Sequence, residues 1–424
     1  MRRREFLKAG IAAVGAAALG PGFWERLLAA PTSPGPSPYG PLLAPDRNGL
    51  MLPAGFSSRV LARSGLPVPG TLYPWPIFPD GAHCFPTGDG GWNLVVNSET
   101  PTADAGVIPD GIQRLGGASR IRFDAAGKIV GAKAVLKNTR TNCAGGPTPW
   151  GTWLSCEEFD DSIRGGPTSR AGKVWECDPN GVAPAKRRDA LGAFKHEAAA
   201  VDPATNRVFL TEDVGDGRFY RFTPASFTGT PNDLNAGTLA AAQLVGPAGG
   251  PWSVTWLPVP DPLALTTSTR YQAPASTEFR GGEGCFYDDG IVYVTTKGDN
   301  RVWRYFIASQ TMDLLYDAND PANQPDPVLT GVDNVIVARS GDVLVAEDGG
   351  NMEIAIITPD NVVAPLLRAT GIQHGIDSPS PVPTKSEITG LAFSPAGDRL
   401  YFSSQRGFVL GITYEVRGPF RASA

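Results

Sequence analysis

Short runs of β-branched and aromatic residues recur along the chain, and each one follows a turn signal. Most of these runs end in polar or acidic residues, and a second strand-like run follows most of them. The spacing between successive pairs is about fifty to sixty residues, with one longer gap near 250–280 that indicates an insertion. We interpret the first runs of the pairs as the inner strands of a repeat. They are residues 92–99, 151–158, 206–213, 290–299, 341–350 and 397–407.

Six such pairs predict an all-β chain that folds as a six-bladed β-propeller with short helical insertions. Each blade would be a four-stranded sheet whose inner strand lines a central channel. A two-domain β-sandwich is the alternative that the same pattern allows. Little helix is expected, and residues 234–245 are the candidate for a short helix in an insertion. Residues 46–65 are expected to lead into the domain with one edge strand.

The N-terminal residues have a different pattern from the rest of the chain. Arg3 and Arg4 precede a Phe-Leu-Lys sequence and a small, apolar stretch, which is typical of a twin-arginine export signal. A non-cleaved amphipathic N-terminus is the alternative. We expect export by the twin-arginine machinery to the periplasm or the medium, and no membrane span after signal removal. The expected segments are a signal peptide at 1–30, a Pro/Gly-rich linker at 31–44 and a single propeller domain at 45–424.

Composition adds two constraints. The 51 glycines and 40 prolines are spread along the 424 residues, as expected for many tight turns between strands. The formal net charge is −5, and the first thirty residues contain more cations than anions. An acidic chain argues against nucleic acid as a partner and suits bound cations, although solubility explains the charge equally well. A monomer is expected, because no coiled-coil pattern or apolar helix is present.

The cysteine count is odd, so at least one thiol is free, metal-bound or paired between chains. No C-x-x-C pair is present, which argues against a zinc ribbon. A pairing of Cys156 with Cys177 is conceivable, because they would lie on neighbouring strands. The sequence also lacks the G-x-S-x-G elbow of α/β-hydrolases and the Walker A loop.

The acidic strand ends are the candidate chemistry. In a propeller they would meet at one mouth of the channel, where their mutual repulsion must be relieved by a cation or a proton. Oxygen-rich clusters favour calcium, and a thiolate adds affinity for iron or zinc. Cys143 with Glu158 and Glu197 would form such a mixed site, whereas a plain turn or simple packing is the ordinary role of each residue alone. The acidic residues expected to converge are Glu99, Glu158, Glu212, Asp213, Glu347 and Asp348.

The three histidines are expected to differ. His196 lies beside Glu197 and is either a ligand or support for the site, or a packing residue. His83 is expected to be structural, and His374 is expected to be exposed. So few histidines make a histidine-rich zinc hydrolase improbable.

Several motifs together resemble the PhoX alkaline phosphatase family, from about residue 45 to the C-terminus. The resemblance implies a six-bladed propeller that hydrolyses phosphate monoesters. It also implies a ferric iron pair with calcium ions, held by one cysteine and several carboxylates, and a small phosphorylated substrate. The motifs are NCAGGPTPWGTWLSCEE, KHEAAAVDP, TEDVGDGRFYRFTP, GGEGCFYDDGIVYVTTKGDNRVWRY and EITGLAFSPAGDRLYFSSQRG.

The resemblance also implies roles for individual residues. Arg280 would hold the phosphate, and Asn97 is the second catalytic candidate. The chain differs from the usual family pattern at Ser98, where histidine is common, and has one more residue between Arg280 and Glu283. The implied metal ligands are Cys143, Glu158, Glu197, Glu212, Asp213, Glu283, Glu347, Asp348, Glu387 and Glu99.

Three functions follow from this reading. The first is an exported metal-dependent phosphatase that acts on phosphate monoesters or other phosphoesters. The second is a calcium-dependent lactonase-type hydrolase on the same architecture, which needs no cysteine ligand. The third is a non-catalytic calcium-binding propeller. Cys143 separates the first from the others, because only the first should lose its metal when this thiol is removed.

Overall fold

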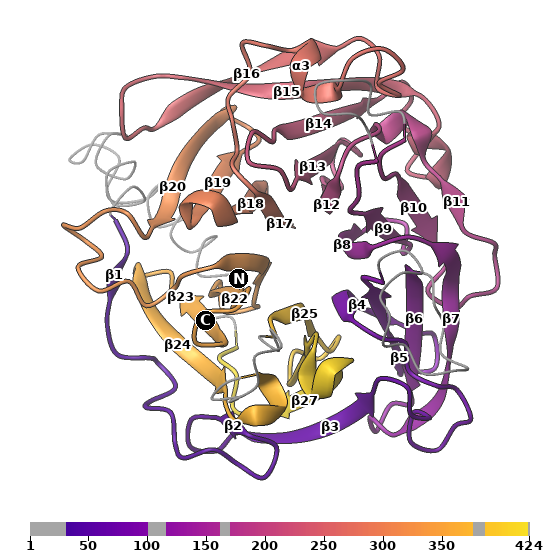
Figure 1. The fold of residues 1–424 in the computed structure, drawn as a ribbon, viewed down its shortest axis with the longest axis vertical. Coiled ribbons are helices and arrows are strands. Elements are labelled where there is room, and N and C mark those ends of the chain that lie inside the picture. Colours follow the sequence, from indigo (N-terminus) through magenta and orange to yellow (C-terminus); the bar gives the residue numbers. More distant parts are fainter. Residues whose placement is uncertain (1–30, 101–115, 162–169, 376–385, 423–424) are drawn as a thin grey trace, which may run out of the picture.

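The computed structural model describes residues 31–100, 116–161, 170–375 and 386–422. The predicted twin-arginine signal at 1–30 lies outside these residues. The described chain is almost entirely β-strand, arranged as sheets around a common centre (Figure 1). None of the helices found in these four segments is long and apolar enough to cross a membrane.

Six antiparallel hairpins in the described residues surround the centre. Their first strands pack against one another in a ring, and β4, β8, β12, β17 and β25 lie nearest the middle of the molecule (Figure 1). The first strands are β4 (Pro79–Pro86), β8 (Asn142–Pro147), β12 (His196–Val201), β17 (Gly282–Asp288), β21 (Val332–Val337) and β25 (Ile388–Phe393).

The strands that the sequence pattern marked as inner are the second strands of these hairpins, so that assignment was wrong by one strand. Three of the true inner strands, β4, β8 and β12, are rich in glycine and alanine and lack the β-branched signal that marks their partners. The second strands are β5 (Trp92–Ser98), β9 (Trp153–Glu157), β13 (Val208–Glu212), β18 (Ile291–Thr296), β22 (Val343–Glu347) and β26 (Arg399–Ser404).

Further antiparallel strands extend each hairpin outward as a meander. The third strands are β6 (Gly116–Phe123), β10 (Val174–Cys177), β14 (Phe219–Pro224), β19 (Arg301–Phe306), β23 (Glu353–Ile357) and β27 (Ile412–Arg417). The fourth strands are β7 (Ile129–Thr139), β11 (Lys186–Arg187), β15 (Gly237–Val245), β20 (Thr311–Asp317), β24 (Val362–Ala369) and β3 (Ser57–Arg63).

The described strands form five sheets, because one strand joins two meanders. This strand, β16 (Trp252–Val259), pairs with β15 on one side and with β20 on the other, giving a nine-stranded sheet. It lies in the region where the sequence indicated an insertion. The architecture is therefore all-β and propeller-like, with two of its meanders fused at the rim.

The predicted helix at 234–245 is wrong for most of its length. Gly237–Val245 is β15, and its pairing with β14 and β16 outweighs the helix propensity of its alanines. The helices found in the described segments are single turns between strands. They are η2 (Asp189–Leu191), η3 (Pro231–Leu234), α3 (Thr269–Gln272), η4 (Lys297–Asp299), η5 (Ile372–His374) and η6 (Gly407–Val409).

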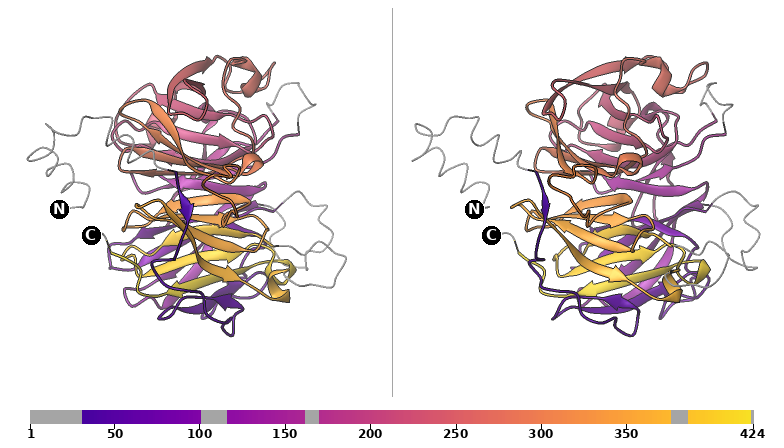
Figure 2. Two further views of the ribbon diagram at one scale, coloured as in Figure 1. Left: turned by 90° about the vertical axis from the view of Figure 1, so that its left-hand side faces the viewer. Right: turned by 60° about the vertical axis from the view of Figure 1, so that its left-hand side comes forward.

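The two ends of the described chain close the ring. β3, near the N-terminus, pairs antiparallel with β27, near the C-terminus, so one sheet contains both (Figure 2). Upstream of it, β1 (Ser33–Pro34) and β2 (Leu50–Met51) pair with β24. The segment at 31–44, which was expected to be a linker, is thus attached to the sheets. Gln324 attaches it further by donating a hydrogen bond to the carbonyl oxygen of Thr32.

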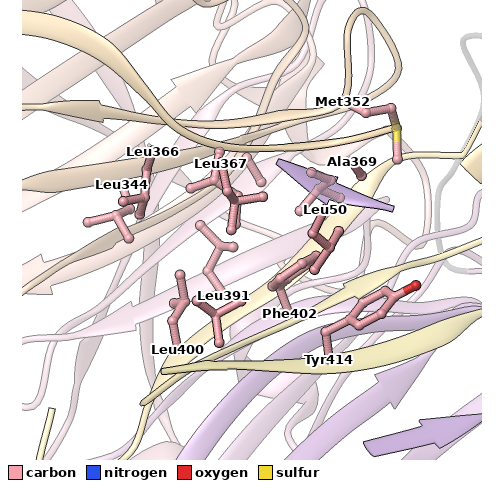
Figure 3. Close-up of a cluster of buried hydrophobic side chains, with 14 of the residues drawn as sticks. Leu50, Leu344, Met352, Leu366, Leu367, Ala369, Leu391, Leu400, Phe402 and Tyr414 are labelled. Carbon is pink, nitrogen blue, oxygen red and sulfur yellow. The ribbon is translucent and has the colours of Figure 1, made fainter. Parts of the chain in front are cut away.

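Hydrophobic layers between neighbouring sheets hold the inner strands in place. In one of them, Leu344 and Leu366 of the β21–β24 sheet face Leu391, Leu400 and Phe402 of the β25–β27 sheet (Figure 3). All five side chains are buried, and burying each of them stabilises the fold by about 1.5–3 kcal/mol. The inner strands are therefore positioned by packing rather than by contacts in the channel.

Candidate metal centre

The second residue of each inner strand forms the heart of the site. Five of these residues are acids or a thiol, and the sixth is Thr389, which donates a hydrogen bond to the carbonyl oxygen of Pro79. All six are buried. Equivalent positions on six radiating strands necessarily meet near the axis, so one residue from each suffices to build a cluster. The five ionisable residues are Asp80, Cys143, Glu197, Glu283 and Asp333.

A β-bulge at the start of every inner strand aims these side chains. In β8, for example, Asn142 pairs with Glu157 and Gly145 with Ser155, which leaves one extra residue on the inner strand beside Cys143. The other five hairpins have the same shift. Bulges bend a strand and re-aim a side chain, and they are frequent beside active sites.

Small residues after the cluster allow the inner strands to approach closely. A Cβ atom on Gly284 would lie 2.6 Å from the backbone nitrogen of Val335, and one on Gly390 would lie 2.4 Å from the carbonyl oxygen of Asp80. Gly390 also has φ +67°, which disfavours any other residue. These glycines are therefore needed for the ring to close tightly around the acids.

A second tier of polar residues lies directly after the second strands. The backbone N–H of each donates to the carbonyl of the residue before the inner strand, as Glu158 does to Thr141 at 2.7 Å. The same bond in all six hairpins places these residues equivalently around the mouth. They are Glu99, Glu158, Asp213, Lys297, Asp348 and Gln405.

Donor atoms from the two tiers come within metal-binding distance of one another. Three overlapping groups have donor atoms that all lie within 4.8 Å of each other. Cys143 belongs to two of these groups, and so does Glu197. The groups are Asp80 with Glu99 and Cys143, Cys143 with Glu158 and Glu197, and Glu197 with Glu283 and Asp333.

Glu197 is the strongest sign that the cluster binds cations. Its side chain is completely buried, and neither carboxylate oxygen has a hydrogen-bond partner among the described residues. Oδ1 of Asp80 is also without a partner there. An ionised carboxylate buried without a partner is costly unless it is paired or coordinates a metal ion. A thiol with several unsatisfied carboxylates is a donor set that fits a transition metal together with a hard cation.

The metal-free cluster favours protons. Burial and the charge of Glu99 raise the pKa of Asp80 to about 8. Burial and the charge of Glu158 likewise raise the pKa of Glu99 to about 8. Burial and the surrounding carboxylates raise the pKa of Glu197 and of the Cys143 thiol well above their usual values. Cations that bound here would therefore displace protons.

Three basic side chains lie between carboxylates at the rim. Lys195 contacts Glu158 and Asp213, and Lys297 contacts Glu283 and Asp348. Arg406 contacts Glu387 at 2.5 Å and Glu99 at 3.7 Å. Burial alone would raise the pKa of Asp213, but Lys195 and Lys297 lower it below its usual value.

Two acids that were expected to converge point elsewhere. Side chains alternate along a strand, so the residue before each second-tier acid faces away from the mouth. Oε1 of Glu212 lies 2.9 Å from Nη1 of Arg270, and Oε2 accepts a hydrogen bond from Tyr220 at 2.8 Å. Glu347 accepts backbone N–H bonds from Thr330 at 2.9 Å and Glu353 at 3.0 Å. Both are structural hydrogen-bond acceptors in this structure.

The two catalytic candidates also lie outside the cluster. Asn97 is buried beneath it, where its amide donates to the carbonyl oxygens of Cys143 and Ala144 and its oxygen accepts from Trp153 and Ser155. Asn97 thus holds the strand that carries the thiol. Arg280 has a 63% exposed side chain whose guanidinium lies 3.5 Å from Glu278.

Sequence reasoning missed Asp80, Asp333 and the three rim cations. Asp80 and Asp333 occupy the second position of their inner strands and are followed by Gly81 and Asn334. A polar residue followed by a small one, repeated once per hairpin, was the available signal. This signal was hidden because the second strands, which are more hydrophobic, dominate the pattern of hydrophobic residues along the chain.

The histidines contribute no ligand to these groups. His196 faces the core, with Nε2 3.2 Å from the carbonyl oxygen of Gly192 and its ring stacked on Phe194. His83 stacks parallel to Trp153 beneath the cluster, as expected of a structural residue. The exposure expected for His374 was wrong, because this residue is fully buried and Nδ1 lies 2.9 Å from Oγ of Ser404.

All five cysteines are free thiols, and all are buried. The conceivable pairing of Cys156 with Cys177 does not form, because Cys156 lies opposite Val174 and Cys177 opposite Trp153 in the ladder.

A comparison with solved structures supports the propeller-like architecture through one match with a high TM-score. PhoX from Pseudomonas fluorescens, solved in complex with vanadate, a transition state analogue, has a TM-score of 0.73 with 18% identity. The match covers 91% of this chain and 98% of that one. A gluconolactonase from Xanthomonas campestris has a TM-score of 0.45 with 12% identity, over 90% of this chain and 99% of that one. The comparison with curated protein sequences found no match.

The family comparison concerns the part of the chain that builds the site. The profile described as alkaline phosphatase PhoX matches residues 131–407. This range includes five of the six inner strands and all three rim cations. The match covers well over half of the 424 residues. The chain therefore belongs to the alkaline phosphatase PhoX family.

Proposed function

We propose that this protein is an exported, metal-dependent phosphatase that hydrolyses phosphate monoesters of small molecules at a cluster of iron and calcium in the propeller channel. The observation that carries the proposal is the buried ring of donors with the unpartnered carboxylate of Glu197. Membership of the PhoX family supports the same chemistry. We also propose that the fold is a six-bladed propeller in which two blades are fused through β16.

We propose that the metals are held by the five ionisable residues of the inner strands, here called the inner ring, together with three acids that adjoin it, Glu99, Glu158 and Glu387. Cys143 and the carboxylates around it offer a soft ligand and hard ligands in contact, which suits ferric iron beside calcium. When bound, such cations neutralise the charge of a phosphate ester and of the group that leaves it. The ligands assigned to this role are Asp80, Glu99, Cys143, Glu158, Glu197, Glu283, Asp333 and Glu387.

Arginines at the mouth are proposed to bind the phosphate. Arg406 follows the second tier directly, and its side chain is 38% exposed while anchored on Glu387 and Glu99. A guanidinium can donate two parallel hydrogen bonds to phosphate oxygens. Arg280 lies beside the same mouth, since its backbone packs on Gly298 next to Lys297. Its exposed guanidinium is the second phosphate-binding group that we propose.

Asn97 is proposed to act through Cys143 rather than on the substrate. Its two N–H bonds to the backbone of β8 hold the thiol in register with the carboxylates. This is a positioning role. It accounts for a buried asparagine whose donors and acceptor are all engaged.

The calcium-dependent lactonase and the non-catalytic calcium propeller fit less well. Neither needs a thiol, yet Cys143 lies within donor distance of four of the carboxylates. The proposed cellular location is the periplasm or the medium, reached through the twin-arginine machinery as a monomer. This part rests on the N-terminal sequence and on the family.

The experiment that tests the proposal combines elemental analysis with hydrolysis of p-nitrophenyl phosphate. The purified exported protein is expected to contain iron and calcium, to hydrolyse the ester, and to lose activity with a chelator. Activity should return when both metals are restored. Calcium alone without hydrolysis would overturn the phosphatase, as would full activity in protein that contains no metal.

A further inference from the structure

We propose that Lys195 and Lys297 are built-in counter-cations of the metal centre, each taking a position between two carboxylates that would otherwise bind a calcium ion. The metal ions of the proposed phosphatase are then confined to the inner ring and the three acids that adjoin it. This inference rests on the proposed function for the inner ring only. It assigns Asp213 and Asp348 to lysines, although the sequence predicts both as metal ligands.

Lys195 bridges two acids of the second tier. Its Nζ lies 2.6 Å from Oε1 of Glu158 and 3.0 Å from Oδ2 of Asp213. The two acids follow second strands of neighbouring hairpins, so they are successive members of the ring. Their side chains are only 10% and 16% exposed. The ammonium group of Lys195 is held between the two carboxylates, and the Lys195 side chain is 28% exposed.

Lys297, on the next hairpin, likewise places its ammonium group between two carboxylates. Its Nζ lies 2.8 Å from Oε1 of Glu283 and 3.0 Å from Oδ2 of Asp348. Lys297 itself occupies a second-tier position, with its backbone N–H bonded to the carbonyl of Gly281. Four of the six equivalent positions around the mouth are acids, and here the chain has a cation in the same place.

The ammonium nitrogens and a calcium ion would compete for the same space. Calcium binds carboxylate oxygens at about 2.3–2.6 Å, and each lysine nitrogen already lies within 3.0 Å of the oxygens of two acids. A metal ion could bind the two acids that a lysine contacts only after that lysine moved away. Each lysine supplies one positive charge where calcium would supply two, and it cannot dissociate from the chain.

The functional consequence is a centre with a fixed outer layer. Glu158 and Glu283 each lie in an inner donor group and also contact a lysine, so the lysines orient the outer edge of the cluster. Both lysines are positioning residues in this account. The outer layer needs no calcium from solution, so its occupancy does not change with the calcium concentration.

Replacing the lysines by an uncharged residue of similar shape tests the inference. Lys195→Met and Lys297→Met are dialysed to equilibrium against calcium, and the metal bound per chain is measured by elemental analysis. Each variant is expected to bind one calcium ion more than the wild type. Lys133→Met is the matched control, because Lys133 donates to the carbonyl of Gly181 far from the centre and should not change the count. An unchanged count in both centre variants would overturn the inference.

Replacing the acids that contact the two lysines gives an independent test in which both lysines are kept. Asp213→Asn and Asp348→Asn should retain the wild-type metal content, because these acids bind ammonium groups. Loss of one metal ion in either variant would overturn the inference, even if the lysine variants failed to fold. Iron in the wild type is read in the same measurement, so its absence would count against the phosphatase, whereas the difference between variants decides the role of the lysines.

Discussion

The thiol of Cys143 donates a hydrogen bond to Oδ2 of Asp80 across 3.5 Å, which joins two adjacent inner strands at the centre of the ring. Gln405 donates to the same carboxylate oxygen at 2.5 Å. Three hairpins far apart in the sequence thus contribute to one small group of atoms. The contact places a soft donor atom and a hard donor atom side by side.

Cys143→Ala is expected to remove the soft ligand and with it the iron. Because the thiol lies in two overlapping donor groups, its loss should lower the hydrolysis of p-nitrophenyl phosphate by at least a hundredfold. Cys84→Ala is the matched control, since Cys84 is a buried thiol in the hydrophobic core. Elemental analysis of both variants makes the comparison, and equal iron content would contradict the assignment.

Glu197→Gln is expected to separate metal binding from stability. In the metal-free protein the folded state must keep this carboxyl protonated, because burial and neighbouring acids raise its pKa. The amide needs no proton, so the variant should be more stable than the wild type in a chelator, by about 1 kcal/mol. It should also lose metal. Thermal unfolding with and without metal measures both effects, and a destabilised metal-free variant would argue against the buried repulsion.

The stability of the metal-free protein should fall as the pH rises. The pKa values of Asp80, Glu99 and Glu387 are raised to about 8 in the folded state, against about 4 in the unfolded chain. Between these values the folded state binds more protons, so the free energy of unfolding decreases from about pH 4 to about pH 8. Bound metal favours the ionised acids and should reduce this dependence. Melting temperatures across this range, in chelator and in metal, test the sign.

Glu212→Gln is expected to destabilise the fold without loss of metal. The change breaks the ion pair between Glu212 and Arg270 and leaves the guanidinium with Asp216 as its remaining acidic partner at 3.3 Å, at a cost of about 2 kcal/mol. Glu158→Gln, by contrast, should change the metal content. Denaturant unfolding together with elemental analysis distinguishes the structural acid from the acid of the cluster. Metal loss in Glu212→Gln would restore the role that the sequence predicts for it.

Arg406→Gln is expected to raise the KM for p-nitrophenyl phosphate about tenfold, because a charged donor to the phosphate is lost at the mouth. Arg280→Gln should have a smaller effect, since its exposed side chain is more strongly screened by solvent. Steady-state kinetics on the two variants rank the arginines. A larger effect for Arg280 would show that substrate binding draws its guanidinium into the site.

The sequence predicts the class of fold well, because the second strands have a strong β pattern at a regular spacing. It does not reveal which strand of each pair lines the channel. The inner strands need glycine and alanine where they approach one another, and small residues such as Gly284 and Ala198 carry no strand signal. Fusion through β16 is likewise set by pairing between residues distant in sequence.

The sequence predicted Cys143 and Glu197 from the chemistry of a mixed site, Glu283 from the resemblance, and the second tier from the strand ends. Cys143, Glu197 and Glu283 fall on the inner ring, whereas Asp80 and Asp333 lie in strands without a conspicuous motif. Adjacent acids such as Glu212 and Asp213 cannot be separated by sequence alone, because the direction of each side chain depends on the register of its hairpin. Cations that neutralise the rim, such as Lys195, appear only when distant hairpins are brought together.

Closure of the ring by β3 and β27 also sets the order in which the protein can be made. The strand at 57–63 is synthesised before the six hairpins, but its partner at 412–417 is synthesised only after all of them. Until then β25 has no complete sheet to belong to, and the gap between β21 and β4 stays open. The donor cluster can therefore close only after β27 has been synthesised. Under the proposed function, metal would bind after this point, and this order would suit export of a protein that is already folded.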